Sequence, residues 1–326
     1  AASVYQTDTG VLSSELYSQI ELHKKFGGVV PEIASRSHIE KINFIVQEAL
    51  TKANKNIDNI DVIAVTNRPG LPGSLLVGLN FAKGVAFAKS KKIVGVNHLH
   101  GHVFSSFLES TPEFPHICLT ASGGHTSMYL VKDYGDIELI GQTLDDAAGE
   151  AFDKISKLMD LGYPGGPIIE KLASENNFQD IYKYPRMVHN NLDFSFSGLK
   201  TAVLYSMVEL GAYDLKAKKF LKPDDKELMV DVSSSLLVCV ADIFQKRLQL
   251  ALRKYPEIKA VTFVGGVACN KYIKNKLSEF AQNNNLKFYS PSPKFCTDNA
   301  AMIAFVGHYL AQQDKLDDYY LDIKLS

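Results

Sequence analysis

Two histidines that lie four residues apart could bind a metal ion together. His98 and His102 fall in the segment VNHLHGHVF, after the β-rich run 93–96, and Asn97 is a suitable N-cap for a helix that begins there. Residues i and i+4 lie on one face of a helix, so both imidazoles can reach one ion. Asp298, in the segment CTDNA, could add a third ligand and leave coordination positions open for chemistry. For the HxxxH spacing alone, a structural role is the alternative, because short motifs also occur without a metal.

Three glycine pairs lie where strands are expected to end, in the segments 122–126, 164–167 and 265–267. Glycine lets backbone N–H groups approach an anion, so such turns could bind phosphate. Asp153 lies in a segment with a helical pattern and could accept hydrogen bonds from both hydroxyls of a ribose. It could equally be a solvated charge on that helix. A single glycine pair is usually only a tight turn, but three pairs at strand ends favour a nucleotide site.

The alternation of strand and helix patterns predicts an α/β protein. Strands are expected at 3–6, 61–65, 93–96, 116–120, 126–131, 260–264 and 287–290, and helices at 74–88, 270–282 and 299–312. The segment 194–200 alternates Phe and Ser, which predicts a half-buried strand that leads into a helix.

The length and the proline-rich segment 112–115 predict two lobes. We expect an N-terminal lobe at 1–114, a C-terminal lobe at 115–298 and a terminal helix, 299–326, that returns to the first lobe. The chain begins without Met inside an expected strand, so we expect a first strand upstream of Ala1.

The composition excludes a strong general attraction to nucleic acid or membranes. The formal net charge of the 326 residues is −1, so an RNA partner would have to bind at local basic groups or through another subunit. Candidate groups for phosphate contacts, or simply solvated charges, are Lys24, Lys25 and Arg36, and Lys216, Lys218 and Lys219. The four cysteines form no CxxC pair, which predicts a reducing cytoplasm without disulfides. No apolar run is long enough for a membrane span, and no signal peptide is evident.

Eight segments, spread in order over almost the whole chain, follow one known pattern. They are GGVVPEIASRSH (27–38), RPGLPGSLLVGL (68–79), NHLHGH (97–102), SGGHT (122–126), DDAAGEAFDKISKLMDLGYPGGP (145–167), DFSFSGLKTA (193–202), GGVACN (265–270) and FCTDNAAMIA (295–304). Together they resemble the bacterial TsaD family, the tRNA N6-adenosine threonylcarbamoyltransferases. The resemblance implies the two-lobed fold of actin, Hsp70 and sugar kinases (the ASKHA fold), with a nucleotide cleft between the lobes.

The resemblance also implies an acyl transfer to tRNA. The threonylcarbamoyl group would pass from threonylcarbamoyl-adenylate to N6 of the adenosine beside the anticodon, in tRNAs that read ANN codons, forming t6A and releasing AMP. No general base for this reaction can be assigned from spacing. The implied partners are tRNA, a TsaB-like paralogue, a TsaE-like ATPase and a second copy in a possible homodimer, with no membrane, in the cytoplasm.

By motif, the implied metal ligands are His98, His102 and Asp298, which would hold one divalent ion per subunit. Iron is the preferred ion, with zinc or magnesium as alternatives. The implied positions for threonylcarbamoyl-adenylate, ATP or AMP are Thr120, Ala121, Ser122, Gly123, Gly124, Asp153, Gly166, Glu170 and Asn270. His100 stands where the family commonly has Glu, and it lies about 200° round the helix from His98, so we do not expect it to be a ligand.

Two other classes of protein remain as alternatives. A small-molecule kinase of the ASKHA fold would use Mg²⁺, but hard Mg²⁺ prefers oxygen ligands to an HxxxH pair. A non-catalytic nucleotide-binding scaffold is the second alternative. It is favoured by the position of the family's first strand and acidic loop, which would precede Ala1, so that this chain is expected to bind nucleotide poorly or not at all. A zinc protease is rejected, because Leu99 stands where that class needs Glu.

Overall fold

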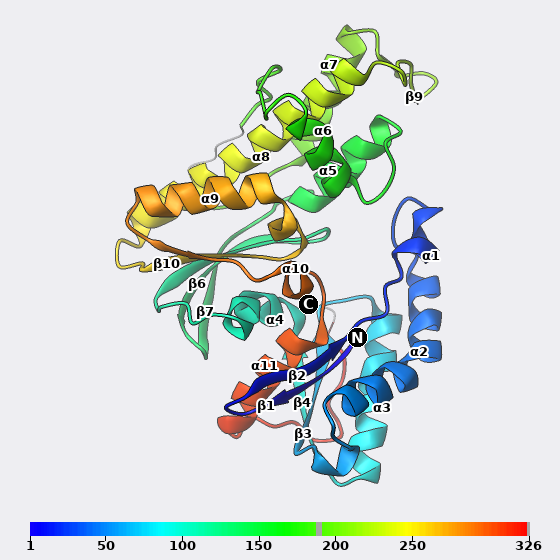
Figure 1. Cartoon of the computed structure of the whole chain (residues 1–326), viewed down its shortest axis with the longest axis vertical. Helices are drawn as coiled ribbons and strands as arrows, with labels where there is room; N and C mark the ends of the chain where they lie inside the picture. Colours follow the sequence, from blue (N-terminus) through cyan, green and yellow to red (C-terminus); the bar gives the residue numbers. More distant parts are fainter. Residues whose placement is uncertain (187–190, 325–326) are drawn as a thin grey trace. The chain divides into compact units, whose positions relative to one another are not determined.

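The computed structural model describes residues 1–186 and 191–324, and the chain divides into two compact units (Figure 1). Unit 1 combines Ala1–Ser110 with Thr297–Ser326, and unit 2 is Thr111–Cys296. Among the described residues, none of the helices has the length and apolar character that a membrane span requires.

Unit 1 contains a β-hairpin, a pair of parallel strands and the helices that cover them. Its strands are β1 (Ala2–Gln6), β2 (Gly10–Glu15), β3 (Val62–Arg68) and β4 (Lys92–Asn97). Its helices are α1 (Ile20–Lys24), α2 (Pro31–Lys52), α3 (Pro72–Ala88), α4 (His98–Phe104) and α11 (Ala300–Gln312), with short 3-10 turns η1 (Ile57–Asn59) and η2 (Ser105–Leu108). Strands β1 and β2 are antiparallel, whereas β3 and β4 are parallel and are joined by α3.

The sequence of α3 explains how this crossover forms. Pro72 occupies the first turn, where a missing N–H costs nothing. The buried residues Leu75, Leu79, Ala82 and Ala86 recur at helical spacing and form one apolar stripe. Leu79, Ala82 and Ala86 pack with Ile93 of β4 into one core cluster. Figure 1 shows α2 and α3 side by side.

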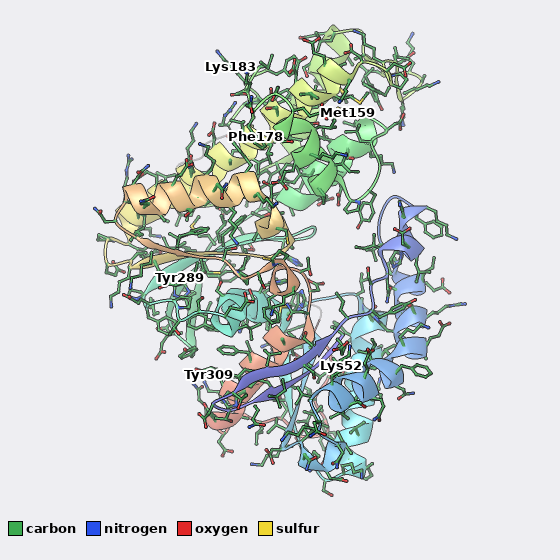
Figure 2. All side chains as sticks on the ribbon, in the orientation of Figure 1. Lys52, Met159, Phe178, Lys183, Tyr289 and Tyr309 are labelled. Atoms are coloured by element: carbon green, nitrogen blue, oxygen red, sulfur yellow. The ribbon has the colours of Figure 1, made fainter. Side chains whose placement is uncertain are left out.

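The C-terminal segment completes unit 1. Gly307 of α11 lies so close to β3 that an added Cβ would overlap Ala64. Beyond α11, the Asp317 carboxylate accepts a hydrogen bond from the backbone N–H of Gly95 at 2.8 Å. Lys52, at the end of α2 and labelled in Figure 2, forms an ion pair with Glu15 of β2 at 2.6 Å. Residues from both ends of the chain therefore build one unit.

Unit 2 is built on a mixed sheet of five strands in the order β11-β10-β5-β6-β7. These strands are β5 (His116–Ala121), β6 (Thr126–Asp133), β7 (Asp136–Gln142), β10 (Ala260–Val264) and β11 (Lys287–Tyr289), and a small hairpin contains β8 (Tyr213–Asp214) and β9 (Lys219–Phe220). The helices are α5 (Ala148–Leu158), α6 (Gly165–Ser174), α7 (Ser197–Glu209), α8 (Lys226–Lys254), α9 (Lys271–Asn283) and α10 (Pro293–Cys296), with the 3-10 turn η3 (Gly266–Cys269). Strands β11, β10 and β5 are parallel, and β6 and β7 are antiparallel.

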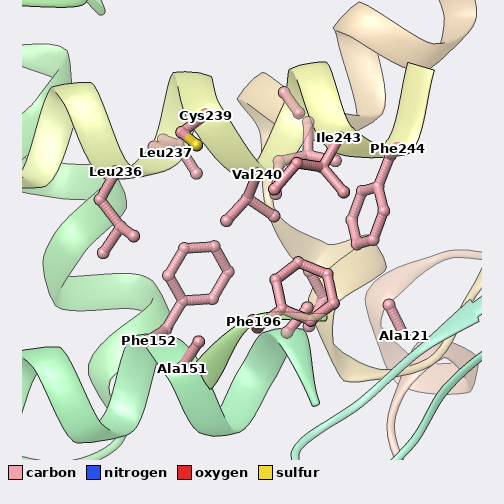
Figure 3. Packing of buried hydrophobic residues seen from close by; sticks show 14 of the residues in the cluster. Ala121, Ala151, Phe152, Phe196, Leu236, Leu237, Cys239, Val240, Ile243 and Phe244 are labelled. Carbon is pink, nitrogen blue, oxygen red and sulfur yellow. The ribbon is translucent and has the colours of Figure 1, made fainter. Parts of the chain in front are cut away.

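The core of unit 2 lies between the sheet and its helices. Figure 3 shows Phe152 of α5 and Phe196 beside α8, which contributes Leu236, Val240 and Phe244. The rings of Phe196 and Phe244 meet edge to face with centroids 6.1 Å apart, a favourable aromatic geometry.

The expected α/β class is confirmed by the parallel strands and their crossover helices. For the segment 194–200, the expected helix is confirmed, because α7 begins at Ser197, but the expected strand is wrong, because Phe194 forms an isolated bridge to Thr143 and belongs to no strand. Phe194 and Phe196 are nevertheless fully buried, so the alternation of Phe and Ser reports burial and not a strand.

Candidate functional site

The three predicted metal ligands converge within unit 1. The Nε2 atoms of His98 and His102 lie 3.3 and 3.1 Å from one oxygen, Oδ1, of Asp298. The two imidazole rings meet edge to face, with centroids 4.7 Å apart. One ligand atom from each residue lies within 4.8 Å of the others, and no other group of this kind is found in the residues that the structure describes. His100, on the same helix, is not a member of the cluster.

Two helix N-termini position these ligands. The side chain of Asn97 caps α4 by accepting a hydrogen bond from the N–H of Leu99 at 2.8 Å. The side chain of Asn299 caps α11 by accepting one from the N–H of Met302 at 2.9 Å. Gly101 lets the two helices approach closely, since an added Cβ would come within 3.0 Å of Met302. Asp298, directly before the second cap, is thereby held beside the histidines.

The electrostatics of the cluster favour an ionised carboxylate facing imidazole nitrogens. Desolvation opposes ionisation of Asp298, but the hydrogen bonds from His102 and His98 hold the pKa of its carboxyl far below the ordinary value. The side chain of His102 is only 4% exposed, whereas that of Asp298 is 76% exposed, so the cluster can be reached from solvent. Two imidazoles and one carboxylate are a donor set that suits a divalent transition metal and leaves further positions open.

The loops after β5 and β10 lie at one edge of the sheet in unit 2. These neighbouring strands are parallel and in register, with Thr120 opposite Val264. In α/β proteins, ligands bind at the carboxyl ends of such strands. Gly265 has a φ of +93°, and an added Cβ would overlap the carbonyl oxygen of Ala121. The predicted residues Thr120 and Ala121 therefore lie directly beside Val264 and Gly265, at the start of the other loop.

Asp153 and Gly166 also lie together, because α6 begins at the glycine pair. The Oδ1 atom of Asp153 accepts a hydrogen bond from the N–H of Gly165 at 2.7 Å. Desolvation raises the pKa of Asp153, and this hydrogen bond opposes the increase. Nothing lies within 4 Å of a Cβ built at Gly166, so the start of α6 is open to a ligand. The expected turn at 164–167 is thus the N-terminus of a helix, where anions are favoured.

Glu170 and Asn270 share the N-terminus of α9. The Oε1 atom of Glu170 accepts hydrogen bonds from the N–H groups of Lys271 and Tyr272, at 2.6 and 3.2 Å. Asn270 is the N-cap of α9, and its side chain accepts a bond from the N–H of Ile273 at 3.0 Å. Glu170 therefore also holds α6 to α9, a structural role that spacing does not reveal.

Two residues that sequence reasoning missed organise the surrounding loops. Gly149 donates its N–H to the carbonyl oxygen of Ser122 at 3.2 Å, and an added Cβ would lie 2.5 Å from that oxygen. Asp145 accepts hydrogen bonds from the hydroxyls of Ser195 and Ser197, at 2.5 and 2.7 Å, and from two backbone N–H groups there. Both lie in segments that stood out in the sequence, but only the fold shows their partners.

Comparison with a solved structure defines the class of protein. HypF from T. kodakarensis matches with a TM-score of 0.61 and 15% sequence identity, over 83% of this chain and 44% of HypF. This likeness concerns the fold alone and confirms the expected ASKHA class. The fold and the site together define an ASKHA-type α/β protein with a candidate metal centre.

The sequence comparisons then give the family. The family model of TsaD, described as tRNA N6-adenosine threonylcarbamoyltransferase, matches residues 10–305. A relative with that name from Dictyoglomus turgidum is 44% identical over 324 residues, which cover 98% of this chain and 93% of the relative. Another, from Geobacter sp. (strain M21), is 46% identical over 312 residues, which cover 95% of this chain and 87% of the relative. The chain belongs to the TsaD family, as its motifs predicted.

Proposed function

We propose that this protein transfers the threonylcarbamoyl group of threonylcarbamoyl-adenylate to N6 of the adenosine beside the anticodon in tRNAs that read ANN codons. A bond forms between N6 and the carbamoyl carbon, the bond from that carbon to the phosphate oxygen breaks, AMP leaves, and N6 loses one proton to solvent. Both relatives described above are named tRNA N6-adenosine threonylcarbamoyltransferases. The observation that carries the proposal is the convergence of His98, His102 and Asp298 at open ligand positions.

Iron is the metal we propose for this cluster, with zinc as the nearest alternative, since imidazole and carboxylate suit both. Magnesium fits less well, because it prefers oxygen ligands. When bound, the ion would act as a Lewis acid on the phosphate and the activated carbonyl. His98 and His102 would hold it through Nε2, and Asp298 would contribute the negative charge that its lowered pKa maintains.

The residues of unit 2 would hold the adenylate. Gly123 and Gly124 are exposed and have open space where a Cβ would stand, so their backbone can approach a phosphate. The open N-terminus of α6 at Gly166 favours the same negative charge. Asp153 uses Oδ1 for Gly165, and its second oxygen can accept a ribose hydroxyl. Glu170 and Asn270, which meet at α9, complete the proposed set.

Product analysis distinguishes this reaction from the kinase alternative. The protein would be incubated with its proposed partners, tRNA and threonylcarbamoyl-adenylate. We expect release of AMP that depends on tRNA and equals the modified adenosine formed. A kinase would instead convert ATP to ADP in the presence of a small-molecule acceptor. If AMP were released at the same rate with and without tRNA, the transferase proposal would be rejected.

For tRNA binding, we propose the β8–β9 hairpin as the site of backbone contacts. Lys216, Lys218 and Lys219 are exposed on this hairpin. The other candidate group consists of Lys24, Lys25 and Arg36. Its members Lys24 and Arg36 are paired with Glu21 and Glu32, at 3.5 and 2.6 Å, so this group carries little net positive charge. Clustered exposed lysines favour a polyanion because binding releases its counterions.

A TsaB-like paralogue would bind at the apolar face of α1 and α2. Exposed large hydrophobic side chains concentrate there, and they are Leu16, Tyr17, Ile20, Leu22, Phe26, Val29, Ile39 and Phe44. Phe44 is 73% exposed, and large apolar side chains exposed together in one segment are typical of an interaction surface. The TsaE-like ATPase and a second copy of the chain remain further proposed partners, and we place the reaction in the cytoplasm, where the four cysteines stay free thiols.

A further inference from the structure

Two of the motif segments contain polar residues to which the proposed transfer assigns no role, and these residues meet in unit 2. Asp145 lies in the connection between β7 and α5, and Ser195 and Ser197 lie in the segment FSFSG around the start of α7. The hydroxyls of Ser195 and Ser197 donate to Oδ2 of Asp145 at 2.5 and 2.7 Å. The N–H groups of Phe196 and Ser197 donate to Oδ1 at 2.8 and 3.2 Å. The carboxylate therefore accepts four hydrogen bonds, two on each oxygen.

These contacts suit Asp145 to hold two segments together and not to transfer protons. Desolvation opposes ionisation of Asp145, but the hydrogen bonds hold the pKa of its carboxyl below the ordinary value. A carboxylate whose acceptor positions are filled in this way binds a proton weakly, so Asp145 is not suited to accept the proton that N6 loses. Hydrogen bonds to an ionised carboxylate are stronger than those between neutral groups, so this contact can fix a loop at the surface.

The connection that carries Asp145 also holds the first glycine loop, 122–126. The N–H of Ala148 donates to the hydroxyl oxygen of Thr126 at 2.9 Å, and this hydrogen bond is buried. The N–H of Gly149 donates to the carbonyl oxygen of Ser122 at 3.2 Å. Both ends of the glycine loop are therefore tied to the start of α5, three and four residues after Asp145.

The segment that carries the serines is anchored by further contacts. Phe194 donates its N–H to the carbonyl oxygen of Gln142 and accepts a hydrogen bond from the N–H of Leu144, both at 2.9 Å. Phe194 and Phe196 are fully buried, and Figure 3 shows Phe196 beside α8. The donors that face Asp145 therefore belong to a segment that the core of unit 2 holds in place.

We propose that Asp145 is a positioning residue of the adenylate site, which fixes the glycine loop 122–126 by holding the start of α5 to the buried segment 194–197. This role rests on the proposed function, in which the loop binds the phosphate of the adenylate. Asp145 is exposed, so water can replace its carboxylate, and the buried rings of Phe194 and Phe196 remain in place without it. Loss of the carboxylate should therefore weaken adenylate binding more than it lowers the free energy of unfolding.

The affinity of the full chain for AMP, measured by titration calorimetry, tests this role. Asp145→Ala should bind AMP at least about fivefold more weakly than the wild type, because a loop that is no longer held must be ordered on binding. Asp145→Asn should stay within about twofold of the wild type, since its amide oxygen can accept from the two N–H groups and its NH2 group can donate to the serine oxygens.

Asp225→Ala is the matched control for the loss of a carboxylate at a helix N-terminus. Asp225 is the N-cap of α8 and accepts a hydrogen bond from the N–H of Leu228 at 3.1 Å. This variant should leave the affinity for AMP unchanged, whereas a general effect of losing such a contact would appear in both alanine variants.

A second readout does not require AMP. Hydrogen exchange at the N–H groups of Ala148 and Gly149 should be faster in Asp145→Ala than in the wild type, and unchanged in Asp145→Asn and Asp225→Ala. Circular dichroism checks that each variant is folded. If Asp145→Ala fails to fold, the double variant Ser195→Ala/Ser197→Ala replaces it, because this variant removes the two hydroxyl donors and keeps the carboxylate. It should change the affinity and the exchange in the same directions.

Three results would overturn the positioning role alone while the wild type binds AMP. They are equal AMP affinity of Asp145→Ala and the wild type, unchanged exchange at Ala148 and Gly149, and equal losses of affinity in Asp145→Ala and Asp225→Ala. If the wild type itself binds no AMP, the proposed adenylate site fails and the positioning role fails with it. The wild-type titration therefore separates a failure of the proposed function from a failure of the role of Asp145.

Discussion

The imidazoles of His98 and His102 share one oxygen of Asp298, at 3.3 and 3.1 Å, and this contact defines the site at the scale of residues. The ionised carboxylate and the two imidazole nitrogens together offer three candidate ligand atoms, and the backbone does not have to rearrange to bring them together. The spacing of the histidines predicts that they share a helix face, because positions i and i+4 coincide on one side. No local pattern shows which carboxylate, 196 residues from His102, folds next to them.

Another histidine, His116, should make the stability of unit 2 depend on pH. It is fully buried in β5, and desolvation lowers its pKa from 6.5 to about 4, although a backbone hydrogen bond with Glu113 opposes this. Between these pH values, the unfolded chain binds a proton that the folded chain does not. The free energy of unfolding is therefore highest above pH 6.5 and decreases by about 3 kcal/mol as the pH falls toward 4.

Urea unfolding at pH 7 and pH 4 measures this loss. The variant His116→Phe removes the titrating group and retains a ring that can stack on Phe114, as His116 does with centroids 5.4 Å apart. The variant should lose about 3 kcal/mol less free energy of unfolding than the wild type between the two pH values. Equal losses in the two proteins would show that His116 does not carry this dependence.

At the scale of elements, the loops after β5 and β10 depend on a backbone that only glycine tolerates. Gly265 has a φ of +93°, and its missing side chain leaves room for the carbonyl oxygen of Ala121. Gly265→Ala should lower the free energy of unfolding by at least about 2 kcal/mol, because strain and overlap add. Gly266→Ala is the matched control, since nothing lies within 4 Å of its Cβ position.

Urea unfolding should show that these two neighbouring variants differ in stability. Gly266→Ala should stay within about 0.5 kcal/mol of the wild type, as surface substitutions usually do. If both alanine variants proved equally stable, the close packing of the two loops would be wrong.

The helices and strands themselves were largely predictable, whereas the hydrogen bonds between distant segments were not. The apolar run of β5 and the N-cap Asn97 of α4 follow from composition and local spacing. The glycine pair at 165–166 predicted an anion site but not a helix that begins there. Asp145 lies fifty residues before Ser195, and such a long-range hydrogen bond leaves no periodic signal in the sequence. Strain and burial at these contacts depend on the whole fold.

At the scale of the whole molecule, the proposed chemistry uses residues of both units. The three candidate metal ligands belong to unit 1, and the proposed adenylate residues belong to unit 2. The chain passes between the units after Ser110 and again after Cys296. The resemblance of motifs predicted both groups of residues, but composition alone predicted only that the chain is long enough for two domains.

Binding of tRNA by the β8–β9 hairpin should depend steeply on salt. Replacing Lys216, Lys218 and Lys219 by Gln removes three exposed charges. The slope of log affinity against log salt concentration should decrease in magnitude by roughly 2 to 3, since each phosphate contact contributes about 0.7 to 0.9. The control replaces Lys24, Lys25 and Arg36, of which Lys24 and Arg36 are already paired with glutamates. A change in slope only in the control would place the tRNA on the other surface.

Partner binding should distinguish two equally exposed phenylalanines. Phe44 on α2 is 73% exposed and Phe87 on α3 is 74% exposed, but only Phe44 lies in the proposed interface. Phe44→Glu should weaken binding of the paralogue by at least about tenfold, or ~1.4 kcal/mol, because the charge would have to be desolvated. Phe87→Glu should have no effect. Titration calorimetry measures both, and equal affinities for the two variants would exclude this face.

The most direct test of the account is nucleoside mass analysis of tRNA after incubation with threonylcarbamoyl-adenylate, this protein and its proposed partners. Asp298→Ala is compared with Asp314→Ala, a carboxylate beyond α11 that lies outside the metal cluster. We predict t6A with the wild type and Asp314→Ala, and at least about tenfold less product per unit time with Asp298→Ala, in parallel with loss of bound metal. Equal t6A formation by Asp298→Ala, or none by the wild type where a known transferase is active, would contradict metal-assisted transfer by this protein.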